Sequence, residues 1–258
     1  MVAMYIAHMR RKRLTATSLK THLSALSFIL KAAGLHNSTD SFTIQKLLIS
    51  YSKKDPPPKV RKPITSKILR HLVQSVKNHT KDKYKRSLYT SIFTTMYHAA
   101  LRVSEVCKTT GTSHALQTHQ ITLTYHAKRK ALKIKLNSYK HCSSNTTPLV
   151  LPQTSTLVCP VKAYTNYRSI RSKSPGPAFR HQSGKPITRE QILSVLHHHL
   201  TLIGHNKEHY NTHSFRIGKT TDLANQGYSH TNIALIGRWH SNAFLKYIKP
   251  PNIICSQP

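Results

Sequence analysis

The residues of this chain that could do chemistry lie in four short segments that are far apart in the sequence. These are A-A-L-R-V-S-E-V at 99–106, N-S-Y-K at 137–140, H-S-F-R at 213–216, and I-G-R-W-H-S at 236–241, which a tyrosine follows. The candidate side chains in them are Arg102, Glu105, Lys140, His213, Arg216, Trp239, His240 and Tyr247. Two arginines, a lysine, a histidine and a tyrosine could together serve phosphoryl transfer, as ligands of an anion, as proton donor and acceptor, and as nucleophile.

Attack of an oxygen on a phosphodiester builds negative charge on the nonbridging oxygens of a pentacoordinate phosphorus. Arg102 and Arg216 could each donate paired N–H groups to that charge, which a planar guanidinium does better than an ammonium group. The H-x-x-R spacing also places His213 and Arg216 one turn apart on the same helix face. Glu105 lies three residues after Arg102 and could orient its guanidinium as a supporting residue.

Tyr247 would supply the attacking oxygen. A phenol normally has a pKa of about 10, so it needs nearby cations or a base, and His213 could assist it. Lys140, expected at a hairpin tip, could protonate the leaving 5′-oxygen, with Lys135 as the alternative because strand faces alternate. Either Trp239 or His240 could donate a hydrogen bond to a phosphate oxygen.

Each of these residues also has an ordinary structural explanation. Arg102 could stabilise the C-terminal dipole of a helix, and Tyr247 could fill the core with its hydroxyl at the rim. His213 could cap a helix or pack inside. The joint occurrence of all of them in this order is what favours a site.

Composition narrows the class of partner. The chain has 258 residues, and 40 Lys and Arg against 7 Asp and Glu give a formal charge of +33. Such a charge points to a polyanion, most simply nucleic acid, and by itself it is equally consistent with RNA or a membrane surface. A two-metal nuclease would draw three or more of the seven acids into one site, so we expect chemistry without a metal or other cofactor.

Other potential sites are weaker. The four cysteines form no C-x-x-C pair, which argues against a zinc knuckle and favours reduced thiols in an intracellular protein. His197, His198 and His199 are consecutive and would point around a helix, so they lack the i, i+4 spacing of chelating ligands. No apolar run is long enough to span a membrane. The basic run at 10–13 is typical of a nuclear import signal, or of a DNA-facing helix end, and the expected location is the nucleus.

The elements that must position the candidate residues divide at a proline-rich basic linker, K-K-D-P-P-P-K-V-R-K-P at 53–63, because three consecutive prolines exclude helix. Before it, residues 1–52 have the apolar periodicity of a small helical module, and because Met1 falls inside a periodic segment we expect this module to be truncated at its start. We expect a helix between Thr15 and Gly34 and another from Ser41. Candidate DNA contacts in the module and linker are Arg10, Arg11, Lys12, Arg13, Lys20, Lys59, Arg61 and Lys62.

Residues 64–258 are expected to form the catalytic domain. Helices are predicted after Thr65 and over about 84–106, and again at about 161–171, 188–203, 213–226, 229–238 and 241–248. Between them, alternation at 121–125 and 132–136 and a short apolar run at 149–151 predict a three-stranded antiparallel sheet. The fold class is therefore mainly α with a small antiparallel β-sheet (α+β).

The order Arg, Lys, His-x-x-Arg, His or Trp, and Tyr, with the lysine at a hairpin, resembles the catalytic domain of the tyrosine recombinases, or phage integrases. The segments A-L-R-V-S-E at 100–105 and G-R-W-H-S-N-A-F-L-K-Y-I at 237–248 resemble recombinases of eukaryotic mobile elements, the DIRS-like and crypton-like group. Y-I-A-H at 5–8 and L-S-A-L at 23–26 are similar to that group's helical, SAM-like core-binding domain. From Trp239 to Tyr247 is eight residues, about one fewer than the family's usual spacing, which leaves Trp239 or His240 for the final phosphate contact.

The resemblance implies a site-specific recombinase that binds double-stranded DNA and cuts and rejoins it through a covalent 3′-phosphotyrosyl link, without metal or ATP. It also implies a homotetramer on DNA during strand exchange, and the free protein could be monomeric. Two other functions remain open at this point. A type IB topoisomerase-like enzyme shares the same residue roles, and a decayed relic would bind DNA without cutting it.

Overall fold

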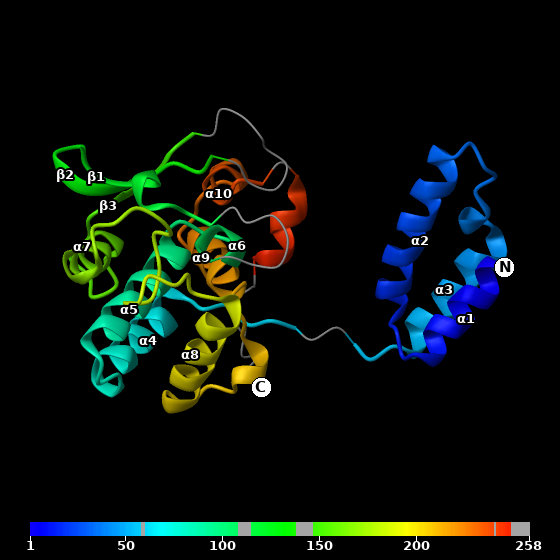
Figure 1. Ribbon diagram of the computed structural model, residues 1–258, viewed down its shortest axis with the longest axis horizontal. Coiled ribbons are helices and arrows are strands. Elements are labelled where there is room, and N and C mark those ends of the chain that lie inside the picture. Colours follow the sequence, from blue (N-terminus) through cyan, green and yellow to red (C-terminus); the bar gives the residue numbers. More distant parts are fainter. Residues whose placement is uncertain (58–59, 108–114, 138–146, 240, 249–258) are drawn as a thin grey trace, which may run out of the picture. The chain divides into compact units, whose positions relative to one another are not determined.

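The computed structural model describes residues 1–57, 60–107, 115–137, 147–239 and 241–248. Lys59, Lys140 and His240, three of the candidate residues, lie outside these ranges. The chain forms two compact units, residues 1–59 and 60–258, and each is described by itself (Figure 1).

The first unit is a small helical module with its own core. Its elements are α1 (Val2–Arg11), α2 (Ala16–Ala32), the 3-10 turn η1 (Ser38–Asp40) and α3 (Phe42–Lys54). Apolar side chains at helical spacing meet in the centre, namely Ile6, Leu19, Leu23, Ile44 and Leu48. The Thr15 hydroxyl caps α2 by accepting from the Ser18 N–H, as its position before the apolar stripe predicts.

The second unit is mostly helical. Its α-helices are α4 (Ser66–His79), α5 (Lys83–His98), α6 (Val103–Val106), α7 (Pro160–Ile170), α8 (Arg189–Leu202), α9 (Ser214–Asn225) and α10 (His230–Gly237). Its 3-10 helices are the single turns η2 (Thr118–Gln120) and η3 (Lys207–His209) and the longer η4 (Asn242–Tyr247). Helix α5 is the central one, since it is buried from Leu88 to Tyr97 and contacts α4, α7 and α9.

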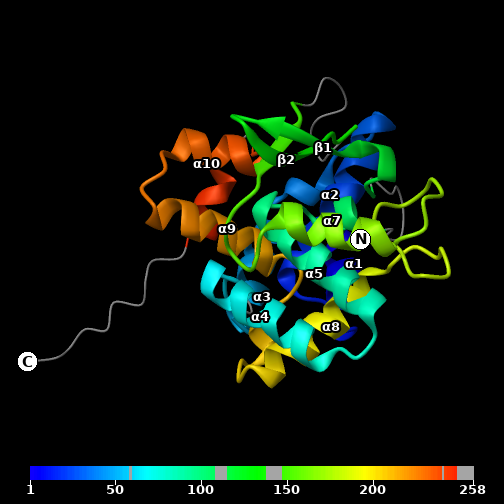
Figure 2. The same ribbon diagram turned by 90° about the vertical axis from the view of Figure 1, so that its left-hand side faces the viewer.

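The sheet has the order β1-β2-β3 and is antiparallel, with β1 (Ile121–His126), β2 (Arg129–Ile134) and β3 (Leu149–Pro152). Ala127 and Lys128 both have positive φ and form the two-residue turn between β1 and β2. The second strand therefore starts earlier and ends earlier than the predicted 132–136. Helix α7 packs against the sheet, as Figure 2 shows.

The long helix predicted over 84–106 is in fact two helices. Helix α5 ends at His98, and Ala100 then adopts φ +45°, which turns the chain out of the helix. The N–H of Leu101 donates to the carbonyl of Met96 at 3.0 Å, a hydrogen bond typical of a helix end. Alanine rarely adopts positive φ, so the apolar periodicity through this segment gave no sign of the break.

The chain enters the second unit along α9. The N–H of Ile64 donates to the Ser214 carbonyl at 2.9 Å, and the N–H of Lys62 donates to the His209 carbonyl at 2.8 Å. Gly218 permits this approach, because a Cβ there would lie 1.8 Å from the Ile64 carbonyl oxygen. Residues 60–64 are thus anchored to the second unit, whereas Asp55 is bonded within the first unit.

The predicted class, mainly helical with one small antiparallel sheet, is confirmed. None of the helices in the described ranges has the length and apolar character needed to cross a membrane.

Candidate functional site

The break after α5 positions the first arginine of the site. Arg102 is the residue that precedes α6, so it does not lie near the end of the long helix as predicted. Its backbone N–H donates to Oε2 of Glu105 at 2.9 Å, and its guanidinium donates to Oε1 at 3.2 Å. Glu105 is only 2% exposed, so this ion pair fixes the Arg102 side chain at the surface of the core.

A third arginine, which the sequence did not single out, completes the environment of Glu105. Arg238 follows α10 in the left-handed conformation, with φ +57°, and its side chain is 8% exposed. Its guanidinium donates to Oε2 of Glu105 at 2.9 Å and to the carbonyls of Ala99 and Ala100 at 3.0 and 3.4 Å. One carboxylate therefore holds two arginines, and Arg238 ties the end of α10 to the α5–α6 turn.

Arg216 is the largest fully buried side chain described, with 1% exposure. It lies in the first turn of α9 and donates to the Ala100 carbonyl at 2.7 Å and to the Gly237 carbonyl. Within the described ranges, two of its five N–H groups are thereby used for positioning, which leaves three for other acceptors.

The aromatic ring of Trp239 covers the Arg216 guanidinium. The guanidinium carbon lies 4.1 Å from the ring centroid, within the range of a cation–π contact. Gly237 allows the ring to fold back, because a Cβ at that position would lie 1.4 Å from Cζ3 of Trp239. Trp239 thus reaches the site as an aromatic neighbour of Arg216.

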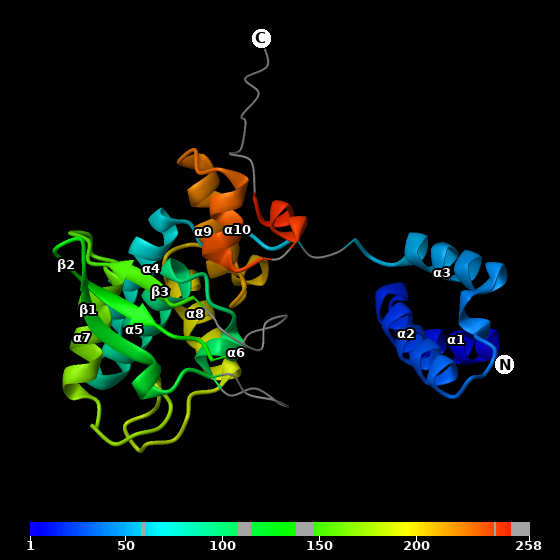
Figure 3. The same cartoon turned by 90° about the horizontal axis from the view of Figure 1, so that it is seen from above.

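Tyr247 lies at the end of η4, packed between two predicted site residues. Its ring centroid is 4.9 Å from that of His213 and 5.6 Å from that of Trp239. The hydroxyl of Thr221 donates to the Tyr247 carbonyl at 3.0 Å, which ties η4 to α9. Figure 3 shows α9, α10 and the red η4 segment side by side. The predicted C-terminal element over 241–248 is present, but as a 3-10 helix.

The electrostatics of the site favour an anion. Burial, followed by repulsion from Arg102 and Arg238, lowers the pKa of Arg216 to about 9. Burial, followed by repulsion from Arg216 and Arg102, lowers the pKa of His213 to about 4. Glu105 pairs with Arg102 and Arg238 but not with Arg216, and a bound phosphate would relieve the mutual repulsion of the three arginines. The imidazole of His213 is neutral at pH 7, the form that can accept a proton.

The structure brings together six of the predicted site residues that it describes: Arg102, Glu105, His213, Arg216, Trp239 and Tyr247. Lys140 and His240 lie outside the described residues, although the sequence places Lys140 between β2 and β3. Lys135, the alternative, is exposed directly after β2, and its N–H bonds to the Gln120 carbonyl at 2.9 Å.

The predicted DNA-contact residues differ in whether their side chains are bonded within the protein or exposed. Arg10 donates to Asp55 and to the Leu14 carbonyl, and its guanidinium lies 5.1 Å from the Tyr51 ring centroid. It therefore stabilises the first unit, and its predicted role as a DNA contact stays a prediction. Arg61 donates to the Glu208 carbonyl at 2.7 Å. The remaining described candidates are exposed: Arg11, Lys12, Arg13, Lys20 and Lys62.

The histidine run has structural partners. His199 bonds to the Ser75 hydroxyl at 2.9 Å, and His197 bonds to the Tyr210 carbonyl at 3.0 Å. Within the described residues, no group of three or more histidine, cysteine or acidic side chains is placed to hold a metal ion.

Sequence reasoning missed Arg238 and Thr221. Arg238 lies in the G-R-W sequence at 237–239, directly after a glycine and an apolar helix. That position is typical of the left-handed residue that ends a helix, and it was the one indication in the sequence of a structural role. Thr221 is one of many polar residues on α9, and nothing in its spacing distinguishes it from its neighbours.

Comparison with known proteins agrees with this geometry. Three solved structures resemble the chain at 14% identity. One is a Tn1549 transposon integrase in complex with circular intermediate DNA, with a TM-score of 0.63 over 98% of this chain and 81% of that one. Another is the XerH site-specific recombinase bound to difH substrate in a pre-cleavage complex, with 0.56 over 96% and 72%. The XerA recombinase has 0.54 over 97% and 78%.

These likenesses establish the fold. No curated protein matches the chain significantly. The model of the family described as "Phage integrase family" matches residues 62–247, which include every described member of the site. The chain therefore belongs to the phage integrase family, the tyrosine recombinases.

Proposed function

We propose that this protein is a site-specific DNA recombinase that cuts and rejoins DNA through a covalent 3′-phosphotyrosyl intermediate on Tyr247. The observation that carries the proposal is the convergence of Arg102, Arg216, His213 and Tyr247 around one cationic position, where the buried carboxylate of Glu105 pairs with Arg102. Family membership and the fold of DNA-bound relatives support the same function.

In the proposed reaction the Tyr247 oxygen attacks the scissile phosphorus. A bond forms between the phenolic oxygen and phosphorus, and the bond from phosphorus to the 5′-oxygen breaks. The phenolic proton passes to His213, and the negative charge of the bound phosphate would offset the repulsion from Arg216 and Arg102 that helps to lower the pKa of this imidazole to about 4. Lys140, with Lys135 as the alternative, protonates the leaving 5′-oxygen. Attack by a 5′-hydroxyl from a partner strand reverses these steps, so neither ATP nor a metal is required.

The arginines are proposed to stabilise the transition state. Arg216 is held by two backbone carbonyls and by the Trp239 ring, so it needs no reorganisation when charge develops on the phosphate. Arg102 is oriented by Glu105, which in turn is held by Arg238. Trp239 or His240 provides a further phosphate contact.

DNA binding is proposed for both units. The charge of +33 and the exposed cations of the first unit favour phosphate contacts, so affinity should fall steeply with salt concentration. The first unit would act as the core-binding domain, and the proline-rich linker would cross the phosphate backbone. Strand exchange between two duplexes requires a homotetramer on DNA.

The finer placement within the family is also part of this proposal. The segments at 100–105 and 237–248 favour a recombinase of a eukaryotic mobile element of the DIRS-like or crypton-like group, acting in the nucleus.

A DNA duplex with a nick close to the cleavage point tests the function, because the short cleaved strand diffuses away and prevents rejoining. A protein–DNA adduct that survives denaturation is expected for the enzyme. Relaxation of supercoils by a monomer without strand exchange would favour the topoisomerase-like alternative. Binding without any adduct would identify a relic.

A further inference from the structure

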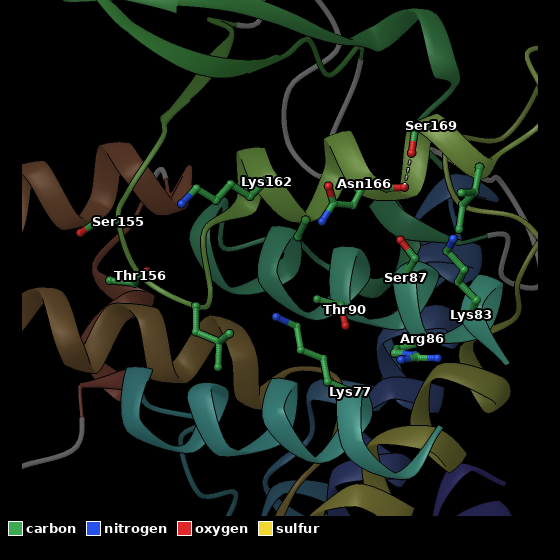
Figure 4. Close-up of a pocket in the computed structure, with 13 residues that line it drawn as sticks. Lys77, Lys83, Arg86, Ser87, Thr90, Ser155, Thr156, Lys162, Asn166 and Ser169 are labelled. Carbon is green, nitrogen blue, oxygen red and sulfur yellow. Dashed lines mark hydrogen bonds between the residues drawn. The ribbon is translucent and has the colours of Figure 1, made fainter. Parts of the chain in front are cut away.

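A second basic site lies in the catalytic unit, apart from the tyrosine site. It is a pocket of about 710 Å³ between α4, α5, α7 and the segment before α7 (Figure 4). None of the predicted catalytic residues lines it. Its volume falls in the usual range of pockets for small ligands, about 300–1,000 Å³.

The charge of this pocket is one-sided. Lys77 from α4, Lys83 and Arg86 from α5, and Lys162 from α7 line it, and no acid is among the lining residues. None of the five ion pairs in the described part of the chain uses any of these four cations. Bringing like charges into one concave site raises their mutual repulsion, which a bound anion would remove.

The pocket also holds donors without partners. Thr90 is 7% exposed, and its hydroxyl has no hydrogen-bond partner within the described residues; the same holds for the buried Nε–H of Arg86. One turn along α5, by contrast, the Thr94 hydroxyl donates to the Thr90 carbonyl at 2.8 Å. A threonine in a helix has two accessible rotamers, so the Thr90 hydroxyl can turn toward a ligand.

We propose that this pocket binds a phosphate-bearing anion. Phosphate oxygens are acceptors only, which matches a lining of ammonium, guanidinium and hydroxyl donors. Ser87, Ser155 and Thr156 add further hydroxyl groups at its walls. The apolar residues Leu157 and Ile170 also line the pocket and would contact the uncharged part of a phosphorylated molecule. The phosphate can belong to a free small molecule or to the backbone of nucleic acid.

Calorimetric titration of the full chain with inorganic pyrophosphate at constant ionic strength tests the proposal. Lys77→Gln with Lys162→Gln removes two cations from the pocket and should weaken binding about tenfold. Lys130→Gln with Lys133→Gln removes the same charge from exposed positions of β2 and should weaken it less than about twofold. Equal effects of the two pairs, or no binding to the wild type, would overturn the proposal.

Thr90→Val separates the ligand role of the hydroxyl from a structural one. Removing a buried hydroxyl that lacks a partner should leave the melting temperature unchanged or higher, while pyrophosphate binding weakens about fivefold. Unchanged affinity in this folded variant would contradict the pocket as the binding site.

Competition identifies the source of the phosphate. If a 20-base-pair duplex displaces pyrophosphate and itself binds more weakly to the Lys77 and Lys162 double variant, the pocket takes a phosphate of DNA. If the duplex binds the variant as it binds the wild type, and pyrophosphate remains bound, the ligand is a free phosphorylated molecule. Both outcomes require that the pocket binds phosphate, and each identifies the molecule that carries this phosphate.

Discussion

Arg238 donates a hydrogen bond of 2.9 Å to Glu105 across 133 positions of the sequence, and this contact connects α10 with the α5–α6 turn. Because Glu105 also binds Arg102, the same carboxylate orients an arginine that we predict to contact phosphate. It also joins the α5–α6 turn to the end of α10, the two segments whose backbone carbonyls bind Arg216. The position of the site thus depends on one buried acid.

Replacement of that acid, Glu105→Gln, should destabilise the protein by about 3 kcal/mol, because two buried or half-buried arginines lose their counterion. Chemical unfolding measures this difference. Glu190→Gln, on the exposed first turn of α8, is the matched control and should cost less than about 1 kcal/mol. Similar losses in the two variants would argue against a central role for Glu105.

Substitution Arg216→Lys keeps the positive charge but removes the fork that reaches the carbonyls of Ala100 and Gly237. Cleavage of a cognate duplex should slow by about 100-fold or more, while DNA affinity changes little, because a guanidinium fork is no longer held in place to stabilise the charge that develops on the phosphate in the transition state. Single-turnover cleavage and a binding titration measure the two quantities. Arg70→Lys on the exposed face of α4 is the control, and it should leave both unchanged.

Gly237→Ala should displace the Trp239 ring from Arg216, since the added Cβ would overlap the ring. Trp239 is the only tryptophan in the chain, so its fluorescence emission reports this movement directly. The emission maximum should shift, and cleavage should fall. Gly204→Ala introduces strain at φ +77° with open space around it, so it can lower the melting temperature but should not move the emission. An unshifted spectrum in Gly237→Ala would show that the ring tolerates the methyl group.

Stability should depend on pH between about 4 and 6.5. Burial lowers the pKa values of His98, His199 and His213 to about 4, so these side chains stay neutral in the folded protein but take up protons on unfolding. Their contribution is fully present above pH 6.5 and is lost as the pH falls toward 4. Each should add up to about 1.4 kcal/mol per pH unit to the slope of the unfolding free energy.

Urea unfolding at several pH values measures that slope. His199→Gln should reduce the slope by the contribution of one proton, up to about 1.4 kcal/mol per pH unit. Most carboxylates titrate near or below pH 4.3, so the upper part of the window belongs to the histidines. A flat profile between pH 5 and 6.5 would mean that these histidines can be protonated in the folded state.

Sequence periodicity predicted most of the fold because the apolar stripes of its helices and the alternation of its strands are clear. The break at Ala100 escaped prediction, since an alanine at positive φ carries no compositional signal. This break turns Arg102 and Glu105 from residues near a helix end into the start of a new helix.

The site was predictable where residue type and order carry the chemistry, as for His213, Arg216 and Tyr247. It was not predictable where a role depends on tertiary contact. Arg238 became visible only through its bond to Glu105, and Arg10 is bound to Asp55 from 45 positions away. A formal charge of +33 could not distinguish structural arginines from free ones.

Covalent trapping on a nicked duplex tests the central claim most directly. The wild-type protein should form an adduct that is stable to denaturation, and phosphopeptide mapping should place it on Tyr247. Tyr247→Phe should bind the same duplex with similar affinity and give no adduct, because only the attacking oxygen is removed. An adduct that persists in Tyr247→Phe, or its absence from a wild-type protein that binds the duplex, would contradict the account.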